Sequence, residues 1–488
     1  MTAPLRRTKI LATLGPATDA PGVLEGIIRA GVDVVRLNFS HGTPADHAAR
    51  VQAIREIAQR LDREVAVLAD LQGPKIRIEK FAEGKVALEA GQRFDLVARA
   101  DVPPGDATQV GVSYLGLVDD VRAGDILALD DGLVTLEVEA VEGERVRTRV
   151  VTSGVLSNRK GVNKIGGGLA LGALTDDDRA HIRIAAELGV DFLAVSFCRN
   201  AADIEEARAL ARAAGSHAWI VAKIERAEAI DNLVEIIEAS DVIMVARGDL
   251  GVEVGDAELP GLQKDIIRKT VERNRIVITA TQMLQSMVDS PIPTRAEVMD
   301  VANAIIDGTD AVMLSAETAA GQYPVRAVEA MARICVGAER QFKHDTDFEA
   351  APRNLERADQ AIAMAAMFLT GHISVRAIVA LTESGGTARF LSRFRSHATI
   401  YALTHDPAAR RRMAMMRDVF PIDFDARGMR IREAARAAVG QLHAAGLLHV
   451  GDRLMLTNGD HMGQLGATNT LRLLEVDENG LATTLGDL

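Results

Sequence analysis

The stretches WIVAKIER, residues 219–226, and DVIMVARGDLGVE, residues 241–253, decide the fold. Each begins with an apolar run and ends in charged residues, which is typical of parallel strands buried on both faces. Alternate residues of a strand share a face, so Lys223 and Glu225 point the same way. If the two strands are neighbours, about 4.8 Å apart, Asp249 can meet Glu225 over one cation. An ammonium group beside two carboxylates suits phosphoryl transfer or enolate chemistry; an ion pair at the rim of a sheet is the alternative.

Six further apolar runs have the same form and alternate with helical patterns. The eight runs begin at Thr8, Asp33, Glu64, Asp191, Trp219, Asp241, Arg275 and Asp310. Helices are predicted near residues 19–30, 45–60, 176–188, 201–214, 227–239, 259–273 and 295–306. Eight strand-then-helix units predict a (β/α)8 TIM barrel within the α/β class, with a doubly wound sheet as the alternative. We favour the barrel because every run ends in polar or reactive residues.

Two segments interrupt or follow this rhythm. Residues 73–164 show no helical period, and their short β-like pieces with turn signals predict a small β-barrel lid domain inserted after the third strand. A lid at that position would stand over the catalytic face, although a merely decorative insertion is possible. The barrel then comprises residues 1–72 and 165–337. After a mixed-charge linker, residues 338–488 are expected to form a C-terminal α/β domain that binds an effector.

Composition narrows the class of protein. The 488 residues carry a net charge of −12, which argues against nucleic acid or an anionic membrane as a partner. The two cysteines, Cys198 and Cys335, fit a reducing cytoplasm rather than a disulfide framework. The first strand is expected within ten residues of the start, which leaves no room for a signal peptide. A membrane span is predicted by an uncharged apolar run of about 18 residues, and the sequence contains no such run. A cytoplasmic location is therefore expected.

A second set of polar residues ends the second and third predicted strands. Arg36, Asn38 and Ser40 alternate onto one face of the motif RLNFSH, and Asp70 ends the next strand. A guanidinium group suits a phosphate by bidentate hydrogen bonds. The oxygens of Asn38, Ser40 and Asp70 suit a hard cation.

With these motifs in place, the chain resembles the pyruvate kinases over nearly its whole length. The matching segments are LNFSHG, GPKIR, SNRKGVN, KIER, VARGDLGVE, ATQMLQSM, the run at residues 293–324 and TESGGTAR. The long run at 293–324 is specific to that family. The resemblance implies phosphoryl transfer from phosphoenolpyruvate to ADP, then protonation of the enolate to pyruvate. It also implies Mg²⁺, for which Mn²⁺ can substitute, and a homotetramer.

The resemblance implies roles for the charged residues at the strand ends. Lys223 matches the lysine that neutralises the phosphoryl group in flight and contacts the substrate. Glu225 and Asp249 match the ligands of the divalent ion. Arg36 and Arg77 match the arginines that grip phosphate from substrate and nucleotide.

The remaining roles concern backbone, hydroxyl and nucleotide contacts. Backbone N–H groups of Arg247, Gly248 and Asp249 would receive the substrate carboxylate at the start of a short helix. Thr281 and Ser315 match hydroxyls near the enolate carbon, with Thr281 also touching substrate, and we assign them to a proton relay through water. His41 and Lys160 match nucleotide contacts, with Lys160 arriving from the lid.

One departure from the family pattern changes a cofactor prediction. Many members read DTKGPEIRT where this chain reads DLQGPKIRI at residues 70–78. In the common form K⁺ lies among oxygens that match Asn38, Ser40 and Asp70, with a glutamate at the position of Lys75. An ammonium group has the charge of K⁺ and donates hydrogen bonds to such oxygens. We therefore predict that Lys75 replaces K⁺ and that K⁺ is not required; alternatively Lys75 only pairs with Asp70 and a K⁺ site persists.

The motif TESGGTAR, residues 382–389, lies between an apolar strand and a helix. Its predicted phosphate cradle comprises Thr382, Ser384, Gly385, Gly386 and Thr387. In the family this loop binds the phosphate of an allosteric activator. Glu383 adds negative charge, and Trp219 is the only tryptophan, so a sugar monophosphate such as glucose 6-phosphate or ribose 5-phosphate, or AMP, is favoured over fructose 1,6-bisphosphate. The alternative is a tight turn without a ligand.

Two other functions are weighed against the kinase. A metal-dependent aldolase or lyase acting on pyruvate needs no nucleotide site, and the lid with Lys160 argues against it. A non-catalytic sensor of phosphorylated metabolites would be indicated by loss of Lys223, Glu225 or Asp249, all of which are present.

Overall fold

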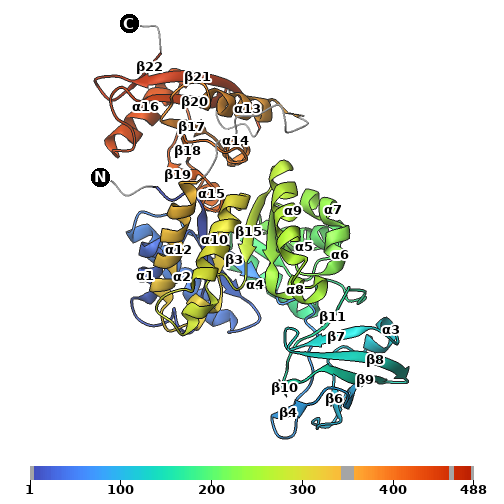
Figure 1. The fold of residues 1–488 in the computed structure, drawn as a ribbon. Helices are drawn as coiled ribbons and strands as arrows, with labels where there is room; N and C mark the ends of the chain where they lie inside the picture. Colours follow the sequence, from blue (N-terminus) through green and yellow to red (C-terminus); the bar gives the residue numbers. More distant parts are fainter. Residues whose placement is uncertain (1–4, 342–354, 356, 461–465, 485–488) are drawn as a thin grey trace.

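The computed structural model describes residues 5–341, 355, 357–460 and 466–484. Eight parallel strands close into a barrel in the order β1-β16-β15-β14-β13-β12-β3-β2 (Figure 1). Their bounds are β1 Lys9–Thr13, β2 Val34–Asn38, β3 Ala66–Asp70, β12 Phe192–Val195, β13 Trp219–Ile224, β14 Val242–Ala246, β15 Ile276–Ala280 and β16 Ala311–Leu314. Each lies within one of the eight predicted runs. The barrel is therefore confirmed over the doubly wound sheet, and β13 and β14 are neighbours as expected.

Helices surround the barrel. They are α1 Val23–Ala30, α2 Pro44–Arg60, α4 Asp176–Glu187, α5 Ala201–Ala213, α6 Ala227–Asp231, α7 Leu233–Ala239, α8 Arg247–Val254, α9 Leu259–Glu272, α10 Arg295–Asp307, α11 Ala316–Ala319 and α12 Pro324–Glu339. A short 3₁₀ turn, η1 Gln285–Val288, follows β15. Two predictions needed adjustment. The first helix begins only after Gly22, which has φ 78°, and the helix expected over 227–239 is broken at Asn232 into α6 and α7.

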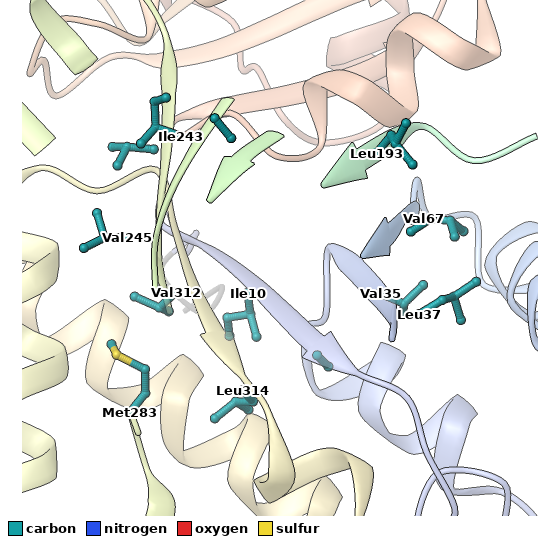
Figure 2. Packing of buried hydrophobic residues seen from close by; sticks show 14 of the residues in the cluster. Ile10, Val35, Leu37, Val67, Leu193, Ile243, Val245, Met283, Val312 and Leu314 are labelled. Carbon is teal, nitrogen blue, oxygen red and sulfur yellow. The ribbon is translucent and has the colours of Figure 1, made fainter. Parts of the chain in front are cut away.

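The core has two layers that differ in what they contact. Side chains on the outer face of the strands, such as Val35, Val67 and Ile243, pack toward the helices (Figure 2). Inside the barrel, Leu68 and Met244 belong to one buried cluster with Met413, Met415 and Met416 of the C-terminal domain. These three methionines are thus part of the core. The C-terminal domain closes the end of the barrel at which the strands begin and leaves the other end for chemistry.

The inserted domain projects from the opposite end of the barrel (Figure 1). Its elements are β4 Lys85–Leu88, β5 Arg93–Val97, β6 Gln109–Gly111, α3 Leu117–Asp120, β7 Ile126–Leu129, β8 Val134–Glu142, β9 Arg145–Thr152, β10 Gly154–Ser157 and β11 Val162–Lys164. Six strands form a curled sheet in the order β11-β7-β8-β9-β5-β6, and β4 pairs with β10 in a ribbon. This domain has its own buried cluster, so it packs as a unit attached to the barrel by two chain crossings.

The C-terminal domain is an α/β layer structure. Its elements are α13 Ala358–Thr370, β17 Ala377–Leu381, α14 Gly386–Leu391, β18 Thr399–Thr404, α15 Pro407–Met413, β19 Val419–Asp423, α16 Ile431–Ala444, β20 Arg453–Gly459, β21 Thr468–Val476 and β22 Ala482–Thr484. The sheet order is β19-β18-β17-β20-β21-β22, parallel up to β20 and antiparallel beyond it. Most of the expected mixed-charge linker lies outside the described residues, and the exact domain boundaries stay predictions. No helix in the described part of the chain combines the length and apolarity needed to cross a membrane.

Candidate active site

An ion cluster occupies the carboxyl ends of β2, β3, β12 and β13. The Lys223 ammonium lies 2.8 Å from Glu225 Oε1 and 3.3 Å from Asp70 Oδ1, and it donates to Ser196 Oγ at 2.7 Å. Arg36 Nε donates to the other Asp70 oxygen at 2.6 Å. The structure thus brings together Arg36, Asp70, Lys223 and Glu225 as the sequence predicted. Ser196 was missed, although it directly follows β12, which lies between β3 and β13.

Burial and charge act against each other in this cluster. Burial alone lowers the pKa of Lys223, but the carboxylates of Asp70 and Glu225 outweigh it and raise that pKa above its usual value. Burial likewise opposes ionisation of Asp70, yet Lys223 and Arg36 hold the pKa of its carboxyl below its usual range. The lysine is therefore a fixed cation, suited to neutralising an anion and unsuited to proton transfer at neutral pH.

Glu225 and Asp249, the predicted metal ligands, are close enough for the charge of one to act on the other. Burial raises the pKa of Glu225, and the nearby charge of Asp249 adds to that rise against the opposing effect of Lys223. Asp249 lies in the first turn of α8, which follows β14. In the described part of the chain no three His, Cys, Asp or Glu side chains gather into a metal cage. Two carboxylates fit Mg²⁺, which keeps waters and takes further oxygens from a substrate.

Lys75 lies elsewhere than expected. Within the described residues its ammonium pairs with Asp249 Oδ1 at 2.9 Å, and not with Asp70. The physical reason is charge balance, because Asp70 already contacts Arg36 and Lys223. The expectation that Lys75 stands among the oxygens of Asn38, Ser40 and Asp70 is corrected accordingly.

Asn38 and Ser40 are held by local contacts at the end of β2. Asn38 Oδ1 accepts the backbone N–H of Ser40 at 3.1 Å, and Asn38 Nδ2 lies 3.3 Å from His41 Nδ1. His41 is exposed at this edge. The loop therefore presents polar atoms beside the ion cluster.

Thr281 and the start of α8 are joined directly. Thr281 Oγ1 accepts the N–H of Gly248 at 2.8 Å and donates to the Ala280 carbonyl at 2.6 Å. Thr281 has φ 68°, a conformation that non-glycine residues rarely adopt. The Arg247 side chain maintains this turn by donating to the Thr281 carbonyl at 2.7 Å and pairing with Asp300 at 2.8 Å. The guanidinium of Arg247 thus has a structural role that the sequence did not reveal.

Ser315 follows β16 and has an unusual hydroxyl. Its Oγ is buried and has no hydrogen-bond partner among the described residues, whereas its backbone N–H donates to buried Glu317 at 2.6 Å. Buried hydroxyls normally have partners, so this one suits a water or substrate contact.

Arg77 and Lys160 lie side by side where the inserted domain joins the barrel. Ile78 donates its N–H to the Lys160 carbonyl, and Arg77 and Gly161 pair in an isolated antiparallel β-bridge. Arg77 Nη1 donates to the Arg159 carbonyl at 2.9 Å, and Lys160 pairs with Asp130 at 2.9 Å. Both cations therefore contact the inserted domain rather than the barrel cluster.

The motif at 382–389 lines a cavity of about 290 Å³ in the C-terminal domain. Its wall includes Thr382, Glu383, Ser384, Gly386, Thr387, Arg357, Arg389 and His405. Gly385 precedes α14 with φ 84°, and a Cβ there would lie 2.7 Å from Met413, so the turn requires glycine. Gly385 donates its N–H to Thr382 Oγ1 at 3.1 Å. Four residues of the predicted cradle, Thr382, Ser384, Gly386 and Thr387, thus line this cavity.

Comparison with known proteins agrees with this geometry. Residues 5–328 match the family described as pyruvate kinase, barrel domain, and residues 360–474 match the pyruvate kinase alpha/beta domain. The chain is 53% identical over 486 residues to pyruvate kinase II of Salmonella typhimurium, covering 98% of this chain and 100% of that protein. It is 51% identical to pyruvate kinase of Haemophilus influenzae over 96% of this chain and 98% of that protein.

A solved structure shows the same fold. The crystal structure of a pyruvate kinase from Cryptosporidium parvum superposes with a TM-score of 0.90 at 32% identity, covering 96% of each chain. The family models together span most of the described barrel and C-terminal domain. The chain therefore belongs to the pyruvate kinase family, as an enzyme built on the barrel whose strand ends carry Lys223, Glu225 and Asp249.

Proposed function

We propose that this chain transfers the phosphoryl group of phosphoenolpyruvate to ADP at the ion cluster, giving pyruvate and ATP, the last step of glycolysis. The observation that carries the proposal is the Lys223 ammonium, held by Glu225, Asp70 and Ser196. The two substrates are polyanions that repel each other, so catalysis rests on positioning and on charge neutralisation. Neither the lyase nor the sensor alternative accounts for this arrangement together with the family membership.

The cations divide the task. Lys223 at the end of β13 neutralises the phosphoryl group during transfer, and Arg36 of β2, which β12 and β3 separate from β13 in the barrel, grips phosphate oxygens. Arg77 and Lys160 stand at the junction with the inserted domain, where they meet the nucleotide together with His41. A divalent ion, Mg²⁺ or in its place Mn²⁺, supplies further positive charge when bound, and Glu225 and Asp249 are the residues that would hold it.

The hydroxyls have distinct parts in enolate protonation. The Thr281 hydroxyl accepts the Gly248 N–H and donates to the Ala280 carbonyl, so it fixes the start of α8. Because the Gly248 N–H is already used there, the substrate carboxylate is assigned to the N–H groups of Arg247 and Asp249. In the part of the chain that the structure describes, the Ser315 hydroxyl has no hydrogen-bond partner, which supports a role in passing a proton through water to the enolate carbon. We assign the relay mainly to Ser315.

K⁺ is not required in this proposal. Lys75 supplies a permanent positive charge 2.9 Å from Asp249, and a monovalent cation close to that ammonium would be repelled. The charge of K⁺ is thus replaced, although at a different carboxylate from the one expected.

The cavity beside residues 382–389 is proposed to bind an activating sugar monophosphate or AMP. Hydroxyls and amides of the loop suit one phosphate, while Glu383, 3.7 Å from His405, disfavours a second. Arg389 lines the cavity and also stacks on Trp219 of β13, with its guanidinium 5.7 Å from the ring centre. Because Lys223 lies on the same strand, this contact links the cavity to the active site.

The assembly and location proposed are a homotetramer in the cytoplasm. The family resemblance supports the tetramer, and both cysteines are buried and unlinked, which fits a reducing compartment.

The test is pyruvate formation from phosphoenolpyruvate and ADP with Mg²⁺ in K⁺-free buffer, with and without KCl. Ribose 5-phosphate, glucose 6-phosphate and AMP are then added singly. We expect activity that KCl barely changes and that one of the monophosphates increases. Activity only with KCl refutes the role of Lys75, and no activity under any condition refutes the kinase.

A further inference from the structure

The inserted domain returns to the barrel through residues 163–171, here called the return segment. This segment passes the loop that follows β13 and the helix α8. That loop carries Glu225, and α8 carries Asp249. Side chains from both elements bind the return segment.

Arg226 makes the first attachment. Its side chain is buried, with 4% of the residue exposed. Its guanidinium donates to the carbonyls of Leu169 at 2.7 Å and Leu171 at 3.3 Å. It also pairs at 3.0 Å with Glu228, which accepts the N–H of Gly168 at 2.6 Å. The planar guanidinium thus holds the backbone of the return segment at two carbonyls directly, and at the Gly168 N–H through Glu228.

Glu253 makes the second attachment from α8. It is also 4% exposed. Its carboxylate accepts the N–H of Ala227 at 2.9 Å and the side-chain amide of Asn163 at 3.4 Å. Its own carbonyl accepts the N–H of Gly166 at 2.9 Å. Glu253 therefore ties three elements together, namely α8, the loop after β13 and β11 of the inserted domain.

The junction leaves some room for movement. A cavity of about 30 Å³ lies at this junction, lined by Lys75, Phe197, Arg226 and Glu253 among others. That volume accommodates about one or two waters. The attachments are thus side-chain hydrogen bonds beside a small cavity, whose wall also includes the apolar side chains of Leu169, Leu171 and Phe197.

We infer that Arg226 and Glu253 are positioning residues that hold the inserted domain in register with the two elements bearing Glu225 and Asp249. Neither side chain is needed at the reacting atoms. Instead, they fix the positions of Lys160 and Arg77 relative to the ion cluster of the barrel. The inference rests on the proposed function, because it assigns those two cations to the nucleotide.

The consequence is selective for one substrate. Phosphoenolpyruvate contacts are proposed on the barrel, whereas Lys160 belongs to the inserted domain. Loosening the junction should raise the KM for ADP by about tenfold, the scale of one lost hydrogen bond to a charged group. The KM for phosphoenolpyruvate should change less than about threefold.

The experiment compares Arg226→Met, Arg226→Lys and Glu253→Gln with the parent enzyme. Hydrogen–deuterium exchange is measured on the full chain without substrates, in peptides covering residues 160–171, and both KM values are measured with Mg²⁺. The matched control is Arg208→Met. Arg208 of α5 is also largely buried, at 16% side-chain exposure, and pairs at 2.8 Å with Asp241. Asp241 accepts the N–H of Ile220 near the start of β13, whereas the junction lies at the end of that strand.

We expect faster exchange in residues 160–171 and the selective rise in KM for ADP in the Arg226 variants, with neither change in Arg208→Met. Arg226→Lys keeps the charge but loses the fork, so it should resemble Arg226→Met if geometry matters. Unchanged exchange, or equal rises in both KM values, overturns the inference. Hydrogen–deuterium exchange needs no turnover, so it tests the junction even if the parent enzyme forms no pyruvate. A parent enzyme without activity would refute the proposed function and leave the test of the junction intact. Should Arg226→Met not fold, Arg226→Lys and Glu253→Gln decide the outcome.

Discussion

Replacing Lys75 tests the proposal that K⁺ is not required. Lys75→Met removes the ammonium 2.9 Å from Asp249 while preserving most of the side-chain volume. The two side chains are 26% and 20% exposed, so the contact is partly shielded from water. A hydrogen bond to a charged group in such a setting contributes about 1.5–3 kcal/mol. At 1.36 kcal/mol per tenfold, the loss corresponds to a decrease of about 10- to 150-fold in kcat/KM.

The assay is pyruvate formation with saturating Mg²⁺ in K⁺-free buffer, then with added KCl or with tetramethylammonium chloride at equal ionic strength. We expect KCl to restore Lys75→Met to within about tenfold of the parent, because K⁺ can occupy the vacated charge position. Tetramethylammonium should not. Lys75→Glu, which installs the residue of the common family pattern, should depend on KCl still more strongly.

The reasoning has a clear refutation. If Lys75→Met keeps the parent's activity without K⁺, the ammonium is dispensable. If the parent itself is strongly activated by KCl over tetramethylammonium chloride, a K⁺ site persists beside Lys75. Either result would leave the ion pair with Asp249 as a purely structural contact.

Four further outcomes are expected. Lys223→Met should lower kcat by about 100- to 1000-fold, the effect of removing one charge-stabilising donor, in the same assay with Mg²⁺. Arg393→Ala leaves Asp310 buried without the guanidinium that contacts both its oxygens, and urea unfolding followed by Trp219 fluorescence should show a loss of about 3–5 kcal/mol. Burial raises the pKa of Glu253 from 4.5 to about 7, so between these pH values the folded state binds a proton that the unfolded state does not. The contribution of Glu253 to the free energy of unfolding therefore falls as the pH rises over this range. Glu253→Gln should therefore gain stability relative to the parent over that range in thermal unfolding at stepped pH, and a constant difference would contradict the pKa. Finally, ribose 5-phosphate, glucose 6-phosphate or AMP should change the fluorescence of Trp219, and Trp219→Phe should lose the signal while keeping the fold.

The barrel could be predicted because each strand is buried on both faces and ends in polar residues. β14, for example, is apolar throughout and then gives way to Arg247 and Asp249 at α8. Helix bounds were less certain where local backbone geometry decides them. Gly22 at φ 78° delays α1, and a break at Asn232 divides one amphipathic pattern into α6 and α7. The inserted domain was recognisable from its turns, but its strand order depends on distant pairings that no local pattern records.

Site residues could be predicted where the period of a strand sets the direction of their side chains. They were harder to predict where the balance of nearby charges decides which ion pair forms. Lys223 and Glu225 share a face of β13, and they do contact each other. Lys75 comes from a segment without regular structure, so its partner depends on which carboxylate lacks a cation. Asp70 already contacts two cations, and Lys75 consequently lies at Asp249. Ser196 escaped notice because a lone serine after an apolar run has no distinctive signal.

The two ends of β13 lie near different domains: its start contacts the C-terminal domain, and the residues after its end contact the inserted domain. At its start, the Trp219 ring contacts Arg389, which lines the cavity beside residues 382–389, and Arg412 of α15, with guanidinium groups 5.7 and 5.6 Å from the ring centre. At its far end, Lys223 lies in the ion cluster and the chain then passes Arg226, which holds the inserted domain. A strand buried in a closed barrel transmits small displacements along its length because its neighbours leave it no room to bend. If the proposed activator binds the cavity, β13 is the shared element through which the cavity, the ion cluster and the junction would be coupled.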